Sequence, residues 1–348
     1  MNNSLDLFKP DLPLISFILI CYNQEKFIQE ALAGAFSQTY SNLEIIISDD
    51  FSSDKTFDIV RNELKKYKGN HIVKVNRNEE NLGISENINR AVGLSHGKLL
   101  VLAAGDDISL PQRCEILHQA FLLHPDAMAI TSAWVKIDEY GCELPTILPN
   151  RYVNGRVDFH GECGWTSRFI KSNDIGTCGA TSSWSRELFT KYGPIPVDVP
   201  AEDAVLSFRA YLSGSVVYLK DKLVKYRTHT NNIFGLSYTS LKHKEYHLQK
   251  FSERSAFTIK AEHEDFCKYQ AFNTAGENIK NGIVFLNWAS ELQNSRSFWW
   301  NRSILWRLRK TLFSIFTLNI SEAKWRGSRV FGIRFLTFVY LIKKTIYN

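Results

Sequence analysis

The sequence predicts an α/β fold in which a mostly parallel, Rossmann-like sheet carries helices on both faces. Three observations lead to this prediction. Short apolar runs alternate four times with helical patterns in about the first 110 residues, a spacing typical of βαβ units. The first run is apolar throughout, as in strands that are buried on both faces. Polar clusters follow three of the runs, at the carboxyl ends of the expected strands, where such sheets bind ligands.

The four runs and the helices between them can be placed in order. Residues 14–20 (LISFILI), 43–48, 71–77 and 98–105 are expected to form strands. Helices are expected at 55–67 and within 80–97. Another helix follows the first strand, because apolar side chains recur there at helical spacing, namely Phe27, Ile28, Ala31, Leu32, Ala35 and Phe36.

Beyond these units the pattern is less regular. Residues 126–137 and 216–224 are predicted strands, and 201–215 is a predicted amphipathic helix that begins with two acids. The chain has a helical pattern from 240 to about 290. We therefore expect a large domain over 1–235, with halves at about 13–110 and 111–235, then a helical segment over 236–295 and a basic tail over 296–348.

Charge is distributed unevenly along the chain. The net charge is +6, but residues 296–348 alone carry +10, so the remaining residues sum to −4. In the tail, residues 303–319 place apolar and basic side chains on different faces of a helix, which is typical of helices that lie on anionic membranes. The alternative is a helix that packs on the rest of the protein and keeps a solvated basic face. Nucleic acid is not expected as a partner, because no recognised binding module accompanies the charge.

The N-terminus and the cysteines bear on location. The N-terminus lacks the basic and apolar regions of a signal peptide, and the apolar runs fall short of the roughly 20 residues that cross a bilayer. The six cysteines contain no CxxC pair and are interpreted as reduced thiols. The expected location is cytoplasmic and peripheral, at the inner face of the plasma membrane.

Adjacent carboxylates are the most informative candidates for chemistry. Asp106 and Asp107 end an apolar strand and repel each other unless a cation lies between them. Carboxylates combined with diphosphate oxygens suit Mg²⁺ or Mn²⁺. The alternative is a solvated turn whose acids meet a helix dipole.

Two further acidic pairs have similar alternatives. Asp49–Asp50 could accept from a ribose hydroxyl or a base N–H, or simply begin an Asx-turn. Glu202–Asp203 could supply a general base, or favourable charge at a helix start. Arg227 and His229 lie two residues apart, so an extended chain points both to one side. There they could meet a diphosphate and a metal, or form an ordinary surface loop.

Taken together, these segments resemble the family 2 glycosyltransferases, which have the GT-A fold. The resemblance runs from about residue 13 to 235 and rests on five ordered motifs. They are "PLISFILICYN…SDDFSSDKT", "NRNEENLGISENINRAV", "LVLAAGDDISLPQR", "AEDAVLSFRAYLSG" and "YRTHTNN".

This resemblance implies an inverting transfer of one sugar from a UDP- or dTDP-sugar to a hydroxyl of a glycan or lipid-linked acceptor, of the bacterial cell-surface polysaccharide type. It implies that Asp203 is the catalytic base, that Asp107 binds the metal and that Asp106 contacts the ribose or the metal. His229 is also expected to bind the metal, and Glu202 and Arg227 to contact diphosphate or acceptor. The nucleotide-binding residues that it implies are Cys21, Tyr22, Asn23, Asp50, Asn81, Asn87 and Asp106. A homo-oligomer is left open.

The chain departs from the family pattern at two positions. Cys21 stands where Thr or Ser is usual, and Phe51 replaces a Gly. A bulky residue is strained in the left-handed backbone region, so the loop at Phe51 is expected to differ locally. The Q-x-x-R-W motif and membrane helices of processive synthases are missing from the sequence, which favours addition of one sugar per encounter.

Other functions remain as alternatives. A sugar-1-phosphate nucleotidyltransferase shares the general architecture but needs a Gly-rich phosphate loop, and "ILICYNQEKF" contains no glycine. An inactive binding or scaffold protein has no need of an acid at 203. A nicotinamide enzyme is disfavoured, because no GxGxxG follows the first strand.

Overall fold

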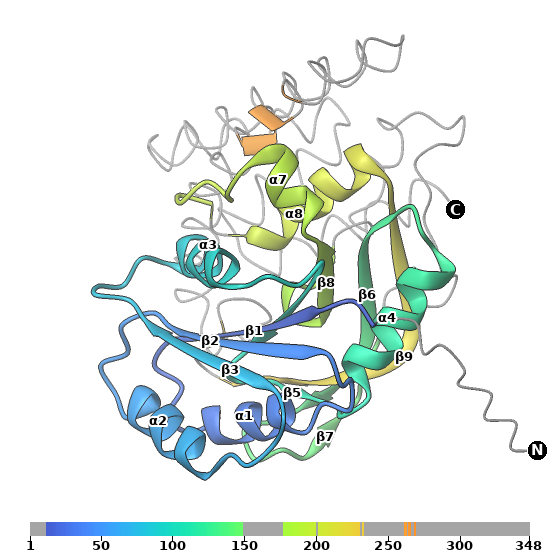
Figure 1. The fold of residues 1–348 in the computed structure, drawn as a ribbon. Helices are drawn as coiled ribbons and strands as arrows, with labels where there is room; N and C mark the ends of the chain where they lie inside the picture. Colours follow the sequence, from blue (N-terminus) through green and yellow to red (C-terminus); the bar gives the residue numbers. More distant parts are fainter. Residues whose placement is uncertain are drawn as a thin grey trace, which may run out of the picture.

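The computed structural model describes residues 12–148, 177–199, 201–229 and 232, together with Ala261, Glu262, Glu264, Asp265 and Lys268. A curled nine-stranded sheet forms its centre, in the order β3-β2-β1-β4-β8-β6-β9-β5, with β7 paired to β6 (Figure 1). The α/β fold that the sequence predicts is confirmed.

The first half of the sheet is parallel. Its strands are β1 (Ile15–Cys21), β2 (Leu43–Asp49), β3 (Ile72–Arg77) and β4 (Leu99–Ala104). β1 lies between β2 and β4, and Cys21 pairs with Asp49 at the carboxyl ends of β1 and β2. These strands confirm the four predicted runs.

Helices cover both faces of this half, which explains why its central strands are apolar on both sides. Ile15, Phe17 and Leu19 of β1 pack with α1 (Ile28–Phe36), α2 (Thr56–Lys66) and α4 (Arg113–Leu123). Ile18 packs on the opposite face with α3 (Ile84–Leu94), α7 (Glu187–Tyr192) and α8 (Glu202–Ser213). Figure 1 shows α1 and α2 below the sheet and α3 above it.

The second half of the sheet is mixed. β6 (Ala127–Ile137) and β9 (Ser215–Arg227) confirm two predicted strands and run parallel to each other. β8 (Ser182–Ser185) joins the halves and is antiparallel to both of its neighbours, β4 and β6. Its sequence, SSWS, is too short and polar to show a strand pattern, although Trp184 is fully buried. The parallel arrangement expected from the sequence therefore holds for the first four strands and changes at β8.

Two short strands complete the sheet. β7 (Glu143–Leu144) pairs with the end of β6, and β5 (Ile108–Ser109) pairs antiparallel with Val224 and Lys225 of β9. The β5–β9 pairing matters for the site, because it places the turn after β4 beside the end of β9. Segments that are more than 100 residues apart in the chain thus become neighbours.

The C-terminal predictions fall largely outside the described residues. In the expected helical segment 236–295, only five residues are described, and these are helical. The expected basic tail 296–348 lies outside the described residues entirely. In the described ranges, no helix has both the length and the apolar character that crossing a membrane requires.

Candidate functional site

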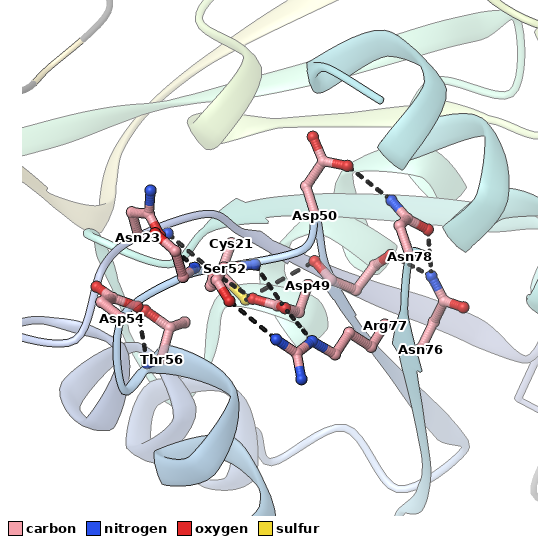
Figure 2. Close-up of polar contacts among 12 residues, drawn as sticks. Cys21, Asn23, Asp49, Asp50, Ser52, Asp54, Thr56, Asn76, Arg77 and Asn78 are labelled. Atoms are coloured by element: carbon pink, nitrogen blue, oxygen red, sulfur yellow. Dashed lines mark hydrogen bonds and ion pairs between the residues drawn. The ribbon is translucent and has the colours of Figure 1, made fainter. Parts of the chain in front are cut away.

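Two loops at the carboxyl ends of β1 and β2 are locked together by hydrogen bonds. The Asp50 N–H donates to the Cys21 carbonyl over 2.9 Å. The Asn23 N–H donates to the Ser52 hydroxyl over 2.9 Å, and the Ser53 N–H donates to Oδ1 of Asn23 over 2.8 Å (Figure 2). These bonds use the Asn23 side chain and backbone to hold the loop, while Tyr22 stays exposed.

Asp49 closes the turn after β2. Its buried carboxylate accepts from the Ser52 N–H over 3.0 Å and from the Ser52 hydroxyl, and lies 3.4 Å from Nε of Arg77 (Figure 2). The Cys21 thiol is 3.7 Å from the same carboxylate. Burial, followed by the charge of Asp49, raises the pKa of Cys21 well above its ordinary value, so Cys21 is a neutral thiol at this end of the sheet.

Asp50 points away from Asp49 and toward the loop before α3 (Figure 2). It accepts from Nδ2 of Asn78 over 2.8 Å and from the backbone N–H groups of Leu82 and Gly83 over 2.9 and 2.8 Å. A carboxylate has about four lone-pair sites, so one acceptor position remains, on Oδ2. Asn81 is exposed beside it and accepts from the Gly83 N–H over 3.1 Å.

Asn87 lies inside the protein, behind Asp50. Its Oδ1 accepts from the Ser48 hydroxyl over 2.6 Å and from Nδ2 of Asn78 over 3.1 Å, and its Nδ2 donates to the Ser48 carbonyl. Asn78 is not among the site residues expected from the sequence, although it lies in the asparagine-rich segment "NRNEEN". Asn87 and Asn78 thus support the end of β2 and the orientation of Asp50.

The Asp106–Asp107 turn is held from behind by Arg227. The Arg227 N–H donates to Oδ1 of Asp107 over 2.8 Å, and its Nε donates to the Asp106 carbonyl over 2.9 Å. Its other guanidinium nitrogens reach the carbonyls of Asp138 and Glu139 and Oε2 of Glu30. The side chain is fully buried, so the guanidinium contacts protein oxygens on each side.

His229 lies beside the first acid of the pair. Its Nε2 is 3.0 Å from Oδ2 of Asp106, and its ring is 4.6 Å, centroid to centroid, from that of Phe27. Asp107 is buried more deeply. Burial and then the neighbouring charge of Asp106 raise the pKa of Asp107 well above its ordinary value, against the opposing effect of the arginines.

A metal ion would relieve this accumulation of acid, but the protein supplies only part of a coordination shell. Within the described ranges, no three or more His, Cys, Asp or Glu side chains are grouped so as to hold a metal by themselves. Asp106, Asp107 and His229 provide carboxylate and imidazole donors on one turn and strand end. The remaining ligands would have to come from water and from an anionic substrate.

The third acidic pair begins α8. The Gly179 N–H donates to Oδ2 of Asp203 over 3.2 Å, and a Cβ at Gly179 would lie only 2.3 Å from Oε1 of Glu202. Burial, followed by the charge of Asp203, raises the pKa of Glu202 to about 8. Burial also raises the pKa of Asp203, although backbone N–H groups counteract it. Glu202 is therefore largely protonated near pH 7.

Cys178 and Tyr226 connect the second and third pairs. Burial raises the pKa of Cys178 to about 12, and the charges of Asp203, Asp107 and Glu202 add to this effect. Burial likewise raises the pKa of Tyr226, with contributions from Cys178, Asp107, Asp106 and Asp203. Both acidic pairs therefore act on the same two side chains.

The first pair, Asp49–Asp50, lies at the adjacent strand end. Cys21 of β1 connects it to β4, because a Cβ at Gly105 would lie 2.8 Å from that of Cys21. The first two acidic pairs thus lie at the carboxyl ends of β2 and β4, and the third contacts Gly179, whose segment Gly179–Thr181 packs against β4. Nothing in the sequence pattern singled out Cys178 or Gly179, whereas Tyr226 stands in the motif "YRTHTNN".

Comparisons with known proteins match this architecture. Residues 16–169 match the model of the family described as Glycosyl transferase family 2. The putative glycosyltransferase EpsE of Bacillus subtilis is 30% identical over 139 residues, which are 40% of this chain and 49% of EpsE. An uncharacterized protein of Mycobacterium tuberculosis is 26% identical over 231 residues, which are 65% of this chain and 62% of that protein. The chain thus spans less than two thirds of the length of these relatives.

A solved structure shares the fold. The crystal structure of S. aureus TarS 1-349 in complex with UDP-GlcNAc superimposes with a TM-score of 0.52 and 19% identity, over 74% of this chain and 73% of that one. At this identity the likeness concerns the fold alone, the Rossmann-like α/β architecture of GT-A proteins. The family match thus covers residues 16–169, and the shared fold extends over a larger part of the chain.

Proposed function

We propose that the protein is an inverting glycosyltransferase that moves one sugar from a UDP- or dTDP-sugar to a hydroxyl of a glycan or lipid-linked acceptor. The observation that carries the proposal is the placement of Asp50 and Asp106–Asp107 at the carboxyl ends of β2 and β4, which flank β1. Asp203 accepts from Gly179, and the segment Gly179–Thr181 packs against β4. A nucleotide bound at Asp50 would extend its diphosphate toward Asp107. The transferred sugar would then lie near Asp203.

Asp50 has the acceptor capacity that a nucleobase needs. Three N–H donors from Asn78, Leu82 and Gly83 fix the carboxylate, and one acceptor position is left for the N–H of a uracil or thymine ring. Tyr22, Cys21 and Asn23 lie on the neighbouring loop, which the Asp50 N–H joins through the Cys21 carbonyl. On the other side, Asn81 and Asn87 contact partners of Asp50, namely Gly83 and Asn78. Asn81 is exposed and Asn87 is buried.

The turn at Asp106–Asp107 is suited to a divalent cation bound with the diphosphate. Two carboxylates and the His229 imidazole fit Mg²⁺ or Mn²⁺ when diphosphate oxygens complete the shell. Bound there, the ion would neutralise charge on the departing nucleotide diphosphate. The chain's own contribution is orientation, since Arg227 fixes the backbone of the turn and His229 contacts Asp106.

Asp203 is placed to act as the general base. Its raised pKa moves it toward the working pH, where a base is most effective. It would take the proton from the acceptor hydroxyl while that oxygen displaces the diphosphate in a single step, which inverts the anomeric centre. The protonated Glu202 beside it would donate a hydrogen bond to substrate or to Asp203 without competing for the proton.

The remaining parts of the proposal concern location and acceptor. TarS is bound to UDP-GlcNAc in its structure and EpsE is named a putative glycosyltransferase, and both support a nucleotide-sugar donor for this chain. The domain over 1–235 would carry catalysis. The basic tail 296–348 would hold the enzyme at the inner face of the plasma membrane, near a lipid-linked acceptor, at roughly 1 kcal/mol for each basic residue.

The test combines nucleotide binding with turnover. We would measure UDP and dTDP affinity of the full chain by calorimetry with and without Mn²⁺, and sugar transfer or donor hydrolysis from a panel of nucleotide sugars. Asp203→Asn should lower turnover by about 10²–10⁴ while UDP affinity stays unchanged. Asp107→Asn should lower affinity only when Mn²⁺ is present, and exposed Asp221→Asn serves as the matched control.

Three outcomes would contradict the proposal. Failure of the wild type to bind any nucleotide diphosphate with Mn²⁺ would remove the donor. Release of pyrophosphate from a nucleoside triphosphate would identify a nucleotidyltransferase instead. Nucleotide binding without turnover on any donor and acceptor would favour an inactive binding protein.

A further inference from the structure

We propose that Gly179 is a positioning residue for Asp203, because the segment 177–182 meets the start of α8 at a point that leaves no room for a side chain. This inference rests on the proposed function, in which Asp203 is the general base. It adds a residue that is not among the site residues expected from the sequence. Gly179 would act through Asp203 rather than by touching the substrate.

Gly179 lies against both acids at the start of α8. Its N–H donates to Oδ2 of Asp203 over 3.2 Å. A Cβ on it would lie 2.3 Å from Oε1 of Glu202 and 3.6 Å from Cβ of Asp203. Its φ lies outside the left-handed region that favours glycine. Conformation alone does not decide residue type in this chain, since Phe51 has a left-handed φ of 63° where a locally different loop was expected. Glycine is therefore needed at 179 for space.

The segment that carries Gly179 is anchored to the sheet. The Thr181 hydroxyl lies 3.1 Å from the hydroxyl of Thr131, in β6, and the Ser182 hydroxyl donates to the Cys178 carbonyl over 2.7 Å. From Ser182 the chain continues into β8, which pairs with β4 and β6. The segment therefore has little freedom to move away from α8.

A second set of contacts fixes the backbone of Asp203. The Ser207 hydroxyl donates to the Asp203 carbonyl over 2.6 Å. This uses its one hydrogen, so the Thr177 hydroxyl is the donor in the 2.8 Å contact between Thr177 and Ser207. The segment 177–182 thus supports Asp203 at the carboxylate through Gly179 and at the carbonyl through Ser207. A side chain at 179 would have to displace Glu202 or break these contacts.

The two acids differ in their access to solvent. Glu202 is only 7% exposed, whereas Asp203 is partly exposed. Asp203 is therefore the acid that an acceptor hydroxyl can reach. The Glu202 carboxyl occupies the place that a side chain at 179 would need.

Gly179→Ala should change the ionisation of Asp203 in the same direction by either route. If the Glu202 carboxyl leaves its buried place, it ionises at lower pH and puts a second negative charge beside Asp203. If the segment moves instead, Asp203 loses an N–H that favours its charged form. Both changes raise the pKa of Asp203, so its ionised form appears only at higher pH.

Other titratable groups act on the same region. They are Cys178 on the segment itself, Tyr226 of β9, and Asp106 and Asp107 after β4. Burial raises the pKa of Cys178 and of Tyr226, so both stay neutral in the working range of pH. All four groups are the same in wild type and variant, so a comparison of the two isolates the acidic pair.

The test measures turnover against pH on the full chain. We expect turnover of Gly179→Ala at pH 7 to be about tenfold to a hundredfold lower, and the acid limb of its profile to lie about one pH unit higher than that of wild type. UDP affinity, measured by calorimetry with Mn²⁺, should stay unchanged, because other segments hold Asp50. Gly93→Ala is the matched control, since a Cβ at Gly93 has nothing within 4 Å, and it should change none of these quantities.

Removal of the Glu202 side chain should abolish the effect. Glu202→Ala makes room for a Cβ at 179, so adding Gly179→Ala to Glu202→Ala should change neither the pH profile nor the free energy of unfolding in urea. If Gly179→Ala alone does not fold, the double variant should still fold and match Glu202→Ala.

The inference is overturned if turnover of Gly179→Ala is unchanged, or if it falls equally at every pH, because Gly179 would then have a structural role only. It is also overturned if Gly179→Ala has the same effect with and without the Glu202 side chain, or if UDP affinity falls as much as turnover. Failure of the proposed function is distinct, since the wild type would then turn over no donor. The urea measurements would still show whether Glu202 requires glycine at 179.

Discussion

The Nε atom of Arg227 donates to the backbone oxygen of Asp106 over 2.9 Å, so the arginine expected at the diphosphate holds the acidic turn from behind. Its replacement by methionine should leave three carbonyls and Glu30 without their donors. We expect a loss of about 3 kcal/mol in the free energy of unfolding, measured with urea, and a smaller loss for Arg227→Lys.

The exposed Arg90, which pairs with Glu86 on α3, supplies the control. Arg90→Met should change stability by less than about 0.5 kcal/mol. Unchanged stability of Arg227→Met together with lost UDP affinity would contradict the supporting role. That result would return Arg227 to the diphosphate contact expected from the sequence.

Glu202 should make stability depend on pH in an identifiable way. Because burial raises its folded-state pKa to about 8, the folded protein binds a proton that the unfolded chain releases above its ordinary pKa. The stability of wild type should therefore fall, relative to Glu202→Gln, as the pH rises from about 4.5 to about 8, and the difference should then level off. Urea titrations at several pH values would measure this difference.

Exposed Glu143→Gln is the control for removing a surface carboxylate, and it should change the free energy of unfolding at pH 7 by less than about 0.5 kcal/mol. A difference between Glu202→Gln and wild type that stays constant from pH 4.5 to 8 would show that Glu202 ionises normally. It would also remove the reason for treating Glu202 as the protonated member of the pair near pH 7.

The sequence was sufficient to predict the parallel half of the sheet. Strands such as β1 and β2 are buried on both faces, so their apolar runs can be recognised without knowing their neighbours. The polar clusters after them were expected at one edge because parallel strands align their carboxyl ends, and the pairing of Cys21 with Asp49 follows this rule.

The parts that the sequence did not predict depend on contacts between distant residues. β8 is polar and owes its place to Trp184 and to pairing with β4 and β6. The use of Arg227 as a support follows from the two-residue pairing of β5 with β9, which has no local pattern. Likewise, Asp49 and Asp50 at the end of β2 have different roles because they accept from different partners. Asp49 accepts from Ser52, and Asp50 accepts from Asn78.

Glu44, at the other end of β2, should give the opposite pH dependence. Burial alone would raise its pKa, but hydrogen bonds from the Ser16 hydroxyl, the His96 N–H and Lys74 outweigh burial and bring the pKa to about 2. Such a group stabilises the folded state above its unfolded pKa, and this contribution is lost as the pH falls through the folded value. Glu44→Gln should therefore lower the free energy of unfolding by about 2–3 kcal/mol at pH 7, and this loss should shrink between about pH 4.5 and 2.

Urea denaturation at pH 7, 4 and 2.5 would measure this loss, with exposed Glu80→Gln as the control. A loss that stays constant with pH would contradict the assignment.

Asp265 should stabilise the helix that presents Asp203. Nε of Arg209, in α8, donates to Oδ2 of Asp265 over 2.7 Å, and its Nη1 donates to the Gly193 carbonyl over 2.7 Å. Both charged side chains are buried, so Asp265→Asn leaves a buried guanidinium without a counter-charge and should cost about 3–5 kcal/mol in unfolding free energy. Lys268→Met is the control, because its amine is about half exposed and lies 3.7 Å from Asp265, and it should cost less than about 1 kcal/mol.

The Asp265→Asn variant also shows whether the contact supports only α8 or the whole domain. The nucleotide half of the domain does not contain Arg209, so UDP affinity should survive Asp265→Asn at temperatures where the protein stays folded. Turnover should fall, because α8 carries Asp203 at its first turn. Equal losses of UDP affinity and turnover would mean that the contact supports the whole domain rather than the helix that carries the base.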